Sequence, residues 1–311
     1  MRVVSLLPSA TEIVAAIGAR DTLVGTSHAC DFPADLSPLP RLTSCDVHAG
    51  APPGAIDAEV RALVGAGAPL YTLDERAIAA LAPDVIFTQA LCDVCAVVES
   101  DVRALAARLA APPRVVTLGA TSLDGVFADI VAVAEALDCA GAGTALVDAL
   151  RARVRLVHET LKAARAPRPK AVVIEWTDPV YLGGHWVPEL VARAGGIDLL
   201  GVAGAHSPRV SIDAVATVRP EIVLVAPCGY DLSRAAAEAR QLMDDPAWHW
   251  LRNGDVWALD ANALTSRPGP RLVDGIETIA RIFAPSLFPP PDARLAERVY
   301  AANAANAPTR S

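Results

Sequence analysis

The feature that most constrains this chain is a stretch near its middle, residues 140–166, which holds no proline until Pro167. The stretch is rich in Ala, Leu, Val and Arg, and its apolar residues recur at spacings of three and four, as on one helix face. These positions include Leu146, Ala149, Leu150, Val154 and Val157. At 1.5 Å per residue, such a helix would be roughly 35–40 Å long. A stiff connector of this length predicts that the residues before it and after it fold as separate units.

Short apolar runs alternate with helical patterns on both sides of that connector. Before it, the sequence predicts strands over 3–7, 22–26, 85–88 and 115–118, and helices over 9–17, 54–66, 74–81, 92–109 and 122–137. After it, the sequence predicts strands over 171–175, 222–226 and 256–259, and helices over 187–194, 211–217, 232–243 and 270–283. Alternation of this kind is typical of parallel sheets covered by helices on both faces.

One local pattern occurs in both halves of the chain. Residues 80–87 and 216–224 each read as a short helix, a proline stop, an acidic residue and a buried strand, with Pro83 and Pro220 as the stops. Two halves built alike indicate two similar lobes. We therefore predict an α/β chain of two Rossmann-like lobes joined by one long backbone helix. The predicted parts are a lobe over 1–139, the helix over 140–166, a lobe over 167–284, and a Pro- and Ala-rich tail over 285–311.

The net charge and the hydropathy of this chain limit the kinds of partner and the cellular location that we expect. Its formal net charge is −8, so it has no strong basic field for nucleic acid. No apolar run reaches the 18 or so residues that span a bilayer, so we expect no transmembrane segment. Pro8 comes too early for the apolar core of a secretion signal. If the chain is complete, we expect a cytoplasmic protein; if a leader has been removed, we expect a periplasmic one.

Three sequence segments resemble one known family. They are Ser5-Leu6-Leu7-Pro8-Ser9-Ala10-Thr11-Glu12, Leu81-Ala82-Pro83-Asp84-Val85-Ile86 and Val218-Arg219-Pro220-Glu221-Ile222-Val223. They are similar to the helical-backbone metal-receptor superfamily, the substrate-binding proteins of ABC importers for cobalamin, haem and iron-siderophores. The cobalamin-binding branch fits best. The resemblance covers roughly residues 2–283 and implies the class III periplasmic-binding-protein fold, with the ligand in the cleft between two lobes.

In such folds ligands bind beyond the carboxyl ends of the strands, where loops converge. Four loops follow or flank the predicted strands: 27–33, 89–95, 175–186 and 226–230, the last accompanied by His206. The side chains that we expect to contact a ligand are His28, Cys30, Asp31, Phe32, Gln89, Cys92, Trp176, His185, Trp186, His206 and Tyr230.

A corrin needs a wide, mostly apolar slot with a few hydrogen-bond donors at its rim. Trp176, Trp186 and Tyr230 offer aromatic faces, and the histidines of these loops offer polar contacts or a nitrogen ligand to cobalt. The alternative for each aromatic residue is a place in the core of a lobe. The alternative for each histidine is a structural role.

The pair Cys92 and Cys95 forms a Cys-x-x-Cys motif at the start of a predicted helix. Such a pair binds a metal, acts as a redox couple, or sits passively at the helix start. Zinc requires about four ligands, and His28 and Cys30 would complete the set. A zinc site of His28, Cys30, Cys92 and Cys95 is therefore one of three interpretations.

The resemblance also implies a membrane partner. Receptors of this family dock onto arginines of an ABC permease through one carboxylate on each lobe, and Glu75 and Asp213 are the candidates by position. The alternative is that both are ordinary helix-start acids, which the helix dipole favours.

Taken together, these features predict a binder of cobalamin or a related corrinoid, an ABC-type substrate-binding protein or a cytosolic relative of one. A haem or iron-siderophore binder and a metal-handling protein based on the Cys pair remain the alternatives. No phosphate loop, Gly-x-Ser-x-Gly or His-Glu-x-x-His motif occurs in the chain, so nothing in it indicates an enzyme.

Overall fold

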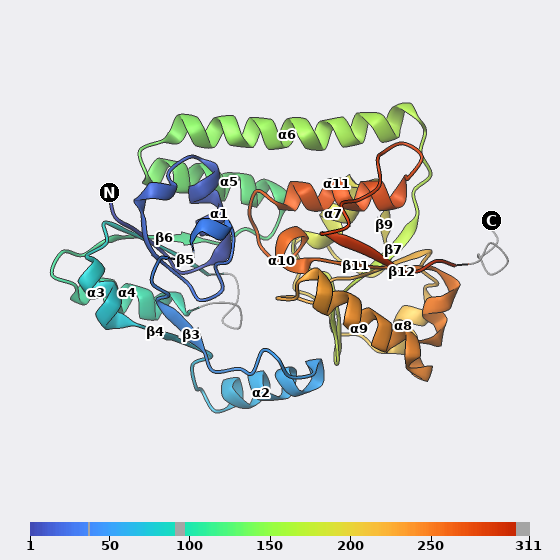
Figure 1. The fold of residues 1–311 in the computed structure, drawn as a ribbon, viewed down its shortest axis with the longest axis horizontal. Coiled ribbons are helices and arrows are strands. Elements are labelled where there is room, and N and C mark those ends of the chain that lie inside the picture. The colour runs from blue at the N-terminus through green and yellow to red at the C-terminus, as the bar shows by residue number, and fades with distance from the viewer. Residues whose placement is uncertain (37, 91–96, 303–311) are drawn as a thin grey trace. The chain divides into compact units, whose positions relative to one another are not determined.

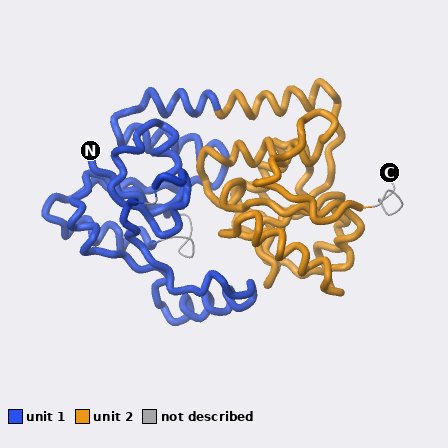
Figure 2. Tube along the Cα trace, viewed as in Figure 1, with its two compact units in different colours: residues 1–149 blue, residues 150–311 orange. Residues whose placement is uncertain are grey.

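A computed structural model describes residues 1–36, 38–90 and 97–302 of the chain. The chain divides into two compact units, residues 1–149 and residues 150–311, drawn in two colours in Figure 2. Each unit is described by itself.

Unit 1 is built on a parallel sheet of four strands in the order β2-β1-β5-β6. Figure 1 labels β5 and β6 of this sheet. The strands are β1 (Val3–Ser5), β2 (Leu23–Thr26), β5 (Val85–Gln89) and β6 (Arg114–Leu118). The three residues of β1 are buried, as are the first four of β5. Central parallel strands are covered on both faces, which is why these runs are apolar throughout instead of alternating.

The helices of unit 1 are α1 (Pro8–Ala16), α2 (Pro53–Gly65), α3 (Glu75–Leu81), α4 (Glu99–Arg108) and α5 (Leu123–Ala136). Their starts follow capping rules: Asp74 and Ser122 accept hydrogen bonds from the backbone N–H groups of Ala77 and Gly125. The helix predicted over 92–109 begins at Glu99, so its predicted start is wrong. Val97 and Val98 are not helical, and residues 91–96 lie outside the described part of the chain.

Two strands of unit 1 were not predicted. β3 (Thr43–Cys45) and β4 (Tyr71–Leu73) pair antiparallel, with Ser44 opposite Thr72. α2 lies between them in the chain, and none of its residues is buried. Strands of three residues are too short to show the alternation by which strands are recognised.

The long helix predicted over 140–166 is confirmed as α6 (Ala140–Ala163). The division between the two units falls inside it, after Ala149. On the unit 1 side, Gly143 allows close approach to α5, since a Cβ there would lie 2.4 Å from Ala134 Cβ. The helix ends before Arg165, whose φ of 49° is left-handed.

Unit 2 contains a six-stranded mixed sheet. Its parallel centre is β7 (Lys170–Thr177), β10 (Ile222–Val225) and β11 (Asp255–Leu259). β8 (Val180–Leu182) and β12 (Ala296–Tyr300) run antiparallel to β7 and β11, and β9 (Ile197–Asp198) pairs with the start of β7. β12 lies within the predicted Pro- and Ala-rich tail, so the tail supplies an edge strand that was not predicted.

The helices of unit 2 are α7 (Val187–Arg193), α8 (Ile212–Thr217), α9 (Leu232–Asp244), α10 (Ala261–Leu264) and α11 (Leu272–Phe283). α9 packs its small residues Ala235, Ala236 and Ala239 into one core cluster with alternate residues of the central strands. Small residues let the helix backbone come close to the sheet. Among the described residues, no helix has both the length and the apolar content needed to cross a bilayer.

Candidate functional site

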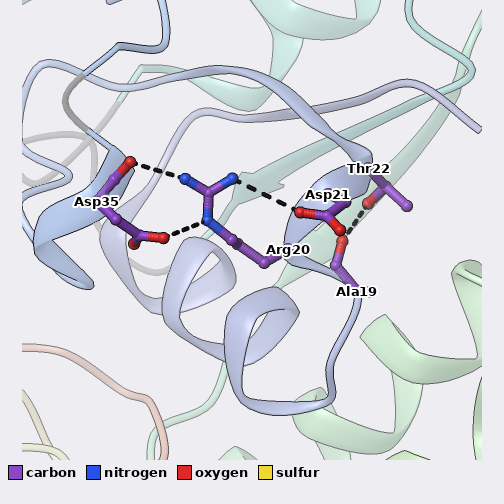
Figure 3. A network of polar contacts seen from close by, with 5 residues as sticks. All are labelled: Ala19, Arg20, Asp21, Thr22 and Asp35. Carbon is purple, nitrogen blue, oxygen red and sulfur yellow. Dashed lines mark hydrogen bonds and ion pairs between the residues drawn. The ribbon is translucent and has the colours of Figure 1, made fainter.

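The loop after β2 carries four of the predicted contact residues in unit 1, and two arginines hold it. Arg20 donates from Nε to Asp35 Oδ2 at 2.7 Å and from Nη2 to the Asp35 carbonyl at 2.7 Å (Figure 3). Arg41 donates from Nη1 to Thr26 Oγ1 at 2.8 Å and to the Cys30 carbonyl at 2.5 Å. The loop is therefore fixed near its start and near its end, so it presents its side chains in defined positions.

A pocket lies at the carboxyl ends of β1 and β2 in unit 1, beside the paired strands β3 and β4. About 310 Å³ of empty space lies in it and in the open solvent at its mouth. Its lining consists of Leu6, Pro8, Ser27, His28, Ala29, Thr43, Tyr71 and Val97. Most of these side chains are apolar or uncharged, and one imidazole is among them.

His28 is held in this pocket by Thr43. Its backbone N–H donates to Thr43 Oγ1 at 3.0 Å, and its Nδ1 lies 2.7 Å from the same oxygen. Its ring lies 5.8 Å from the Tyr71 ring, centroid to centroid. Loss of hydration and the Arg41 cation both lower the pKa of His28, so the ring is neutral at neutral pH.

Cys30 is buried, whereas the two residues that follow it are exposed. Cys30 is 1% exposed, and its sulfur lies 3.1 Å from Thr11 Oγ1, which also donates to Ser5 Oγ at 2.8 Å. Asp31 and Phe32 are exposed, with Phe32 at 45%. Cys30 is thus placed inside unit 1, whereas Phe32 presents an aromatic face to its surface.

Gln89 ends β5 and is half-buried, with its Nε2 atom lacking a hydrogen-bond partner among the described residues. Cys92 and Cys95 lie outside the described part of the chain. Across the part that is described, no group of three or more His, Cys, Asp or Glu side chains gathers as metal ligands. His28 and Cys30 instead contact Thr43 and Thr11, so the structure offers nothing in support of the zinc interpretation.

In unit 2, an aromatic pair lies where β7 ends. The rings of Trp176 and Tyr230 meet edge to face with 5.6 Å between centroids, although 54 positions separate them in sequence. The Trp176 indole N–H donates to the Asp178 carbonyl at 3.0 Å, and the ring stays half-buried. Arg234 of α9 lies over the Tyr230 ring at 3.7 Å, a cation–π contact. Tyr230 is 2% exposed, so it supports Trp176 from beneath.

A second group in unit 2 brings three predicted residues together. The ring of His185 lies 5.6 Å from that of Trp186 and 5.2 Å from that of His206, the latter edge to face at 85°. Trp186 is 4% exposed, and its indole N–H donates to the Thr265 carbonyl at 2.7 Å. It therefore packs inside unit 2. His185 is half-buried and His206 is exposed, so the three rings pass from the core to the surface.

Glu175, at the end of β7, fixes the loop that carries His206. Its Oε2 accepts a hydrogen bond of 2.5 Å from Ser207 Oγ. Burial raises the pKa of Glu175, while hydrogen bonds from Ser207 and the Gly184 N–H oppose the rise. Glu175 was absent from the predicted contact residues. Its sequence signal, an acid at the end of a buried strand, does not reveal a partner 32 residues away.

The two predicted docking acids begin short helices and are exposed. Glu75 Oε1 forms an ion pair with Arg108 Nη2 at 2.8 Å, and the Glu75 side chain is 53% exposed. Asp213 lies in the first turn of α8, which Ser211 caps through the Ala214 N–H. Both carboxylates are accessible on their own units.

Comparison with known proteins identifies a family and several relatives of this chain. A profile of the family described as periplasmic binding protein matches residues 3–263. A vitamin B12-binding protein of Vibrio cholerae serotype O1 is 23% identical over 293 residues, which cover 89% of this chain and 87% of the relative. Its counterpart in Vibrio parahaemolyticus is 24% identical, with 91% and 89% coverage.

Two solved structures are similar over nearly the whole chain. A periplasmic haem-binding protein from Pseudomonas aeruginosa superposes with a TM-score of 0.73 at 22% identity, covering 97% of this chain and 99% of that one. The periplasmic vitamin B12-binding protein BtuF of Vibrio cholerae superposes with a TM-score of 0.64 at 21% identity, covering 92% and 97%. At these identities the likeness shows a common fold, the two-lobed fold with a connecting helix.

Proposed function

This chain belongs to the periplasmic binding protein family, and we propose that it binds cobalamin or a related corrinoid as the substrate-binding protein of an ABC importer. The observation that carries the proposal is the uncharged pocket of unit 1, where Leu6, Pro8, Tyr71 and Val97 surround the neutral imidazole of His28. A corrin presents a large apolar edge with uncharged amides, so such a lining suits it.

Trp176 and Phe32 each offer an aromatic face to a ligand on their own unit. Both have exposed ring area, and Trp176 is supported by Tyr230. The names of the two Vibrio relatives support a corrinoid over other ligands. Glu75 and Asp213 would meet the permease, one from each unit, and for Glu75 this requires release of the Arg108 ion pair.

Haem is the second candidate ligand, and the likeness to the Pseudomonas aeruginosa haem-binding protein favours it. Haem carries two propionates and would require cations near the site, whereas a corrinoid would not. No Lys or Arg is among the described residues that line the pocket of unit 1, and Nη1 of the nearby Arg41 donates to the Thr26 hydroxyl and the Cys30 carbonyl. The corrinoid is therefore the better fit to the described residues of the pocket in unit 1.

Colour distinguishes the two ligands. The purified protein is mixed with hydroxocobalamin or with haemin, desalted, and its visible spectrum recorded. We expect a retained, coloured complex with hydroxocobalamin and little retention of haemin. A protein that emerges colourless from the first mixture and coloured from the second would replace the corrinoid with haem. A protein colourless from both would end the proposal.

A tryptophan variant tests the predicted contact surface. Trp176→Leu removes an aromatic face, and we expect about tenfold weaker corrinoid binding, which corresponds to about 1.4 kcal/mol. Trp257→Leu is the matched control. Trp257 lies on β11, away from the predicted contact residues in the chain, and the guanidinium of Arg298 from β12 lies over its ring. Equal losses in both variants would assign the effect to stability, and no loss in Trp176→Leu would remove this residue from the site.

A further inference from the structure

Hydrogen bonds and a close backbone contact hold the loop of residues 201–207 in unit 2, although much of it is exposed. The His185 N–H donates to the Ala205 carbonyl at 2.6 Å, and the Gly204 N–H donates to the His185 carbonyl at 2.7 Å. A Cβ on Gly184 would lie 2.3 Å from the Ser207 nitrogen, so the two backbones touch there. The segments 183–185 and 204–207 thus form one platform, although residues 201–206 are mostly exposed.

Glu175 adds a side-chain anchor to this platform. Its side chain is half-buried, and its carboxyl group accepts a hydrogen bond from Ser207, the residue after His206. Burying a carboxyl group costs free energy that hydrogen bonds only partly offset. The exposed side chain beside the anchor is the imidazole of His206.

The rings behind His206 give it a fixed support. His185 meets it edge to face at 5.2 Å, and Trp186 lies behind His185. The His185 Nε2 atom is buried and has no hydrogen-bond partner among the described residues, whereas the His206 side chain is exposed. His206 is therefore a supported, exposed nitrogen donor.

We infer that His206 supplies an axial nitrogen ligand to the cobalt of a bound corrinoid, and that Glu175 is its positioning residue. This inference rests on the proposed function and specifies its ligand. In the exchange, the lone pair of the neutral imidazole forms a bond to cobalt(III), and the bound water leaves with both of its protons. The oxidation state of cobalt does not change.

The test compares two corrinoids that differ at the exchangeable position. Water leaves cobalt(III) readily and cyanide does not, so only aquocobalamin offers a position to His206. We expect the wild-type chain to bind aquocobalamin at least tenfold more tightly than cyanocobalamin, measured by quenching of tryptophan fluorescence. We also expect the visible bands of bound aquocobalamin to shift as its water is replaced by a nitrogen ligand.

Four variants locate the donor and its support. His206→Ala should abolish the band shift and bring the two affinities together, at about the wild-type affinity for cyanocobalamin. Ser207→Ala and Glu175→Ala should each reduce the ratio of the affinities while cyanocobalamin binding persists, which a loss of folding would not do. His158→Ala, at an exposed position on α6, should leave the ratio unchanged.

Three outcomes would overturn the inference, and they can be told apart. Equal wild-type affinities with no band shift would contradict axial ligation and leave the proposed function intact. A ratio that survives in His206→Ala but falls in His28→Ala would move the donor to unit 1. Binding of neither corrinoid would contradict the proposed function itself.

Discussion

Glu175 and Gly184 are two residues whose importance depends on distant partners. Each meets the segment around Ser207, one through its carboxyl group and one through its missing side chain. Trp176, His185 and His206 could be named as candidate contact residues from the sequence because their side chains have recognisable chemistry. Glu175 could not, since an acid near the end of a strand has many possible roles and its partner is known only from the fold.

The raised pKa of Glu175 predicts a dependence of stability on pH. The group titrates near 4.5 in a solvated chain and at higher pH when folded. Between these two values the folded state binds more protons than the unfolded state, so the free energy of unfolding falls as pH rises through that interval. Glu175→Gln should flatten the dependence in urea titrations at a series of pH values. Glu159→Gln, exposed on α6, should reproduce the wild-type slope; a wild-type slope in Glu175→Gln would contradict the assignment.

Gly184 predicts a steric effect of a single methyl group. In Gly184→Ala, the new Cβ would meet the Ser207 nitrogen at 2.3 Å and the His206 carbonyl carbon at 2.7 Å, so backbone must move. We expect a loss of about 2 kcal/mol in the free energy of unfolding, as for overpacked cores. In Gly141→Ala, nothing lies within 4 Å of the new Cβ in α6, and a gain of roughly 0.5–1 kcal/mol is expected. Equal stability of the two variants would show that the 204–207 loop yields easily.

At the scale of elements, long helices with a continuous apolar pattern could be predicted from the sequence, whereas strands of two or three residues could not. α6 was recognisable because its apolar spacing continues over many residues without a proline. β3, β8 and β9 have two or three residues each, and their pairing depends on neighbours far away in the chain. β12 follows a proline-rich segment, and only its pairing with β11 explains why residues 296–300 are extended.

The second half of α6 is joined to α11 by one arginine. Arg153 donates to Glu277 Oε1 at 2.9 Å and to Asp274 Oδ1 at 2.5 Å, and both carboxylates raise its pKa. Arg153→Met keeps the aliphatic stem and removes the charge, and we expect a loss of about 1 kcal/mol that shrinks as salt is added. Arg155→Met, at an exposed position on the same helix, is the control. Thermal unfolding at low and high salt measures both, and a salt-independent loss would assign the effect to packing.

At the scale of the whole molecule, two α/β units and a long connecting helix could be predicted from alternation and from a repeated local pattern. The ligand could not be predicted with the same certainty, because the fold is common to relatives named for haem and for vitamin B12. We expect ligand choice to depend on a few side chains on loops, such as His28 and His206. Their placement depends on residues such as Arg41 and Glu175 that no short motif reveals.

The helix α2 provides an opportunity for engineering. It connects the two hairpin strands that bring Thr43 and Tyr71 to the pocket of unit 1, yet it buries none of its own residues. A fluorescent dye attached there, for example at Val64, which is 53% exposed, would leave the core of the unit intact. Because α2 lies between β3 and β4 in the chain, such a dye could report binding in the pocket of unit 1 and turn this chain into an optical sensor.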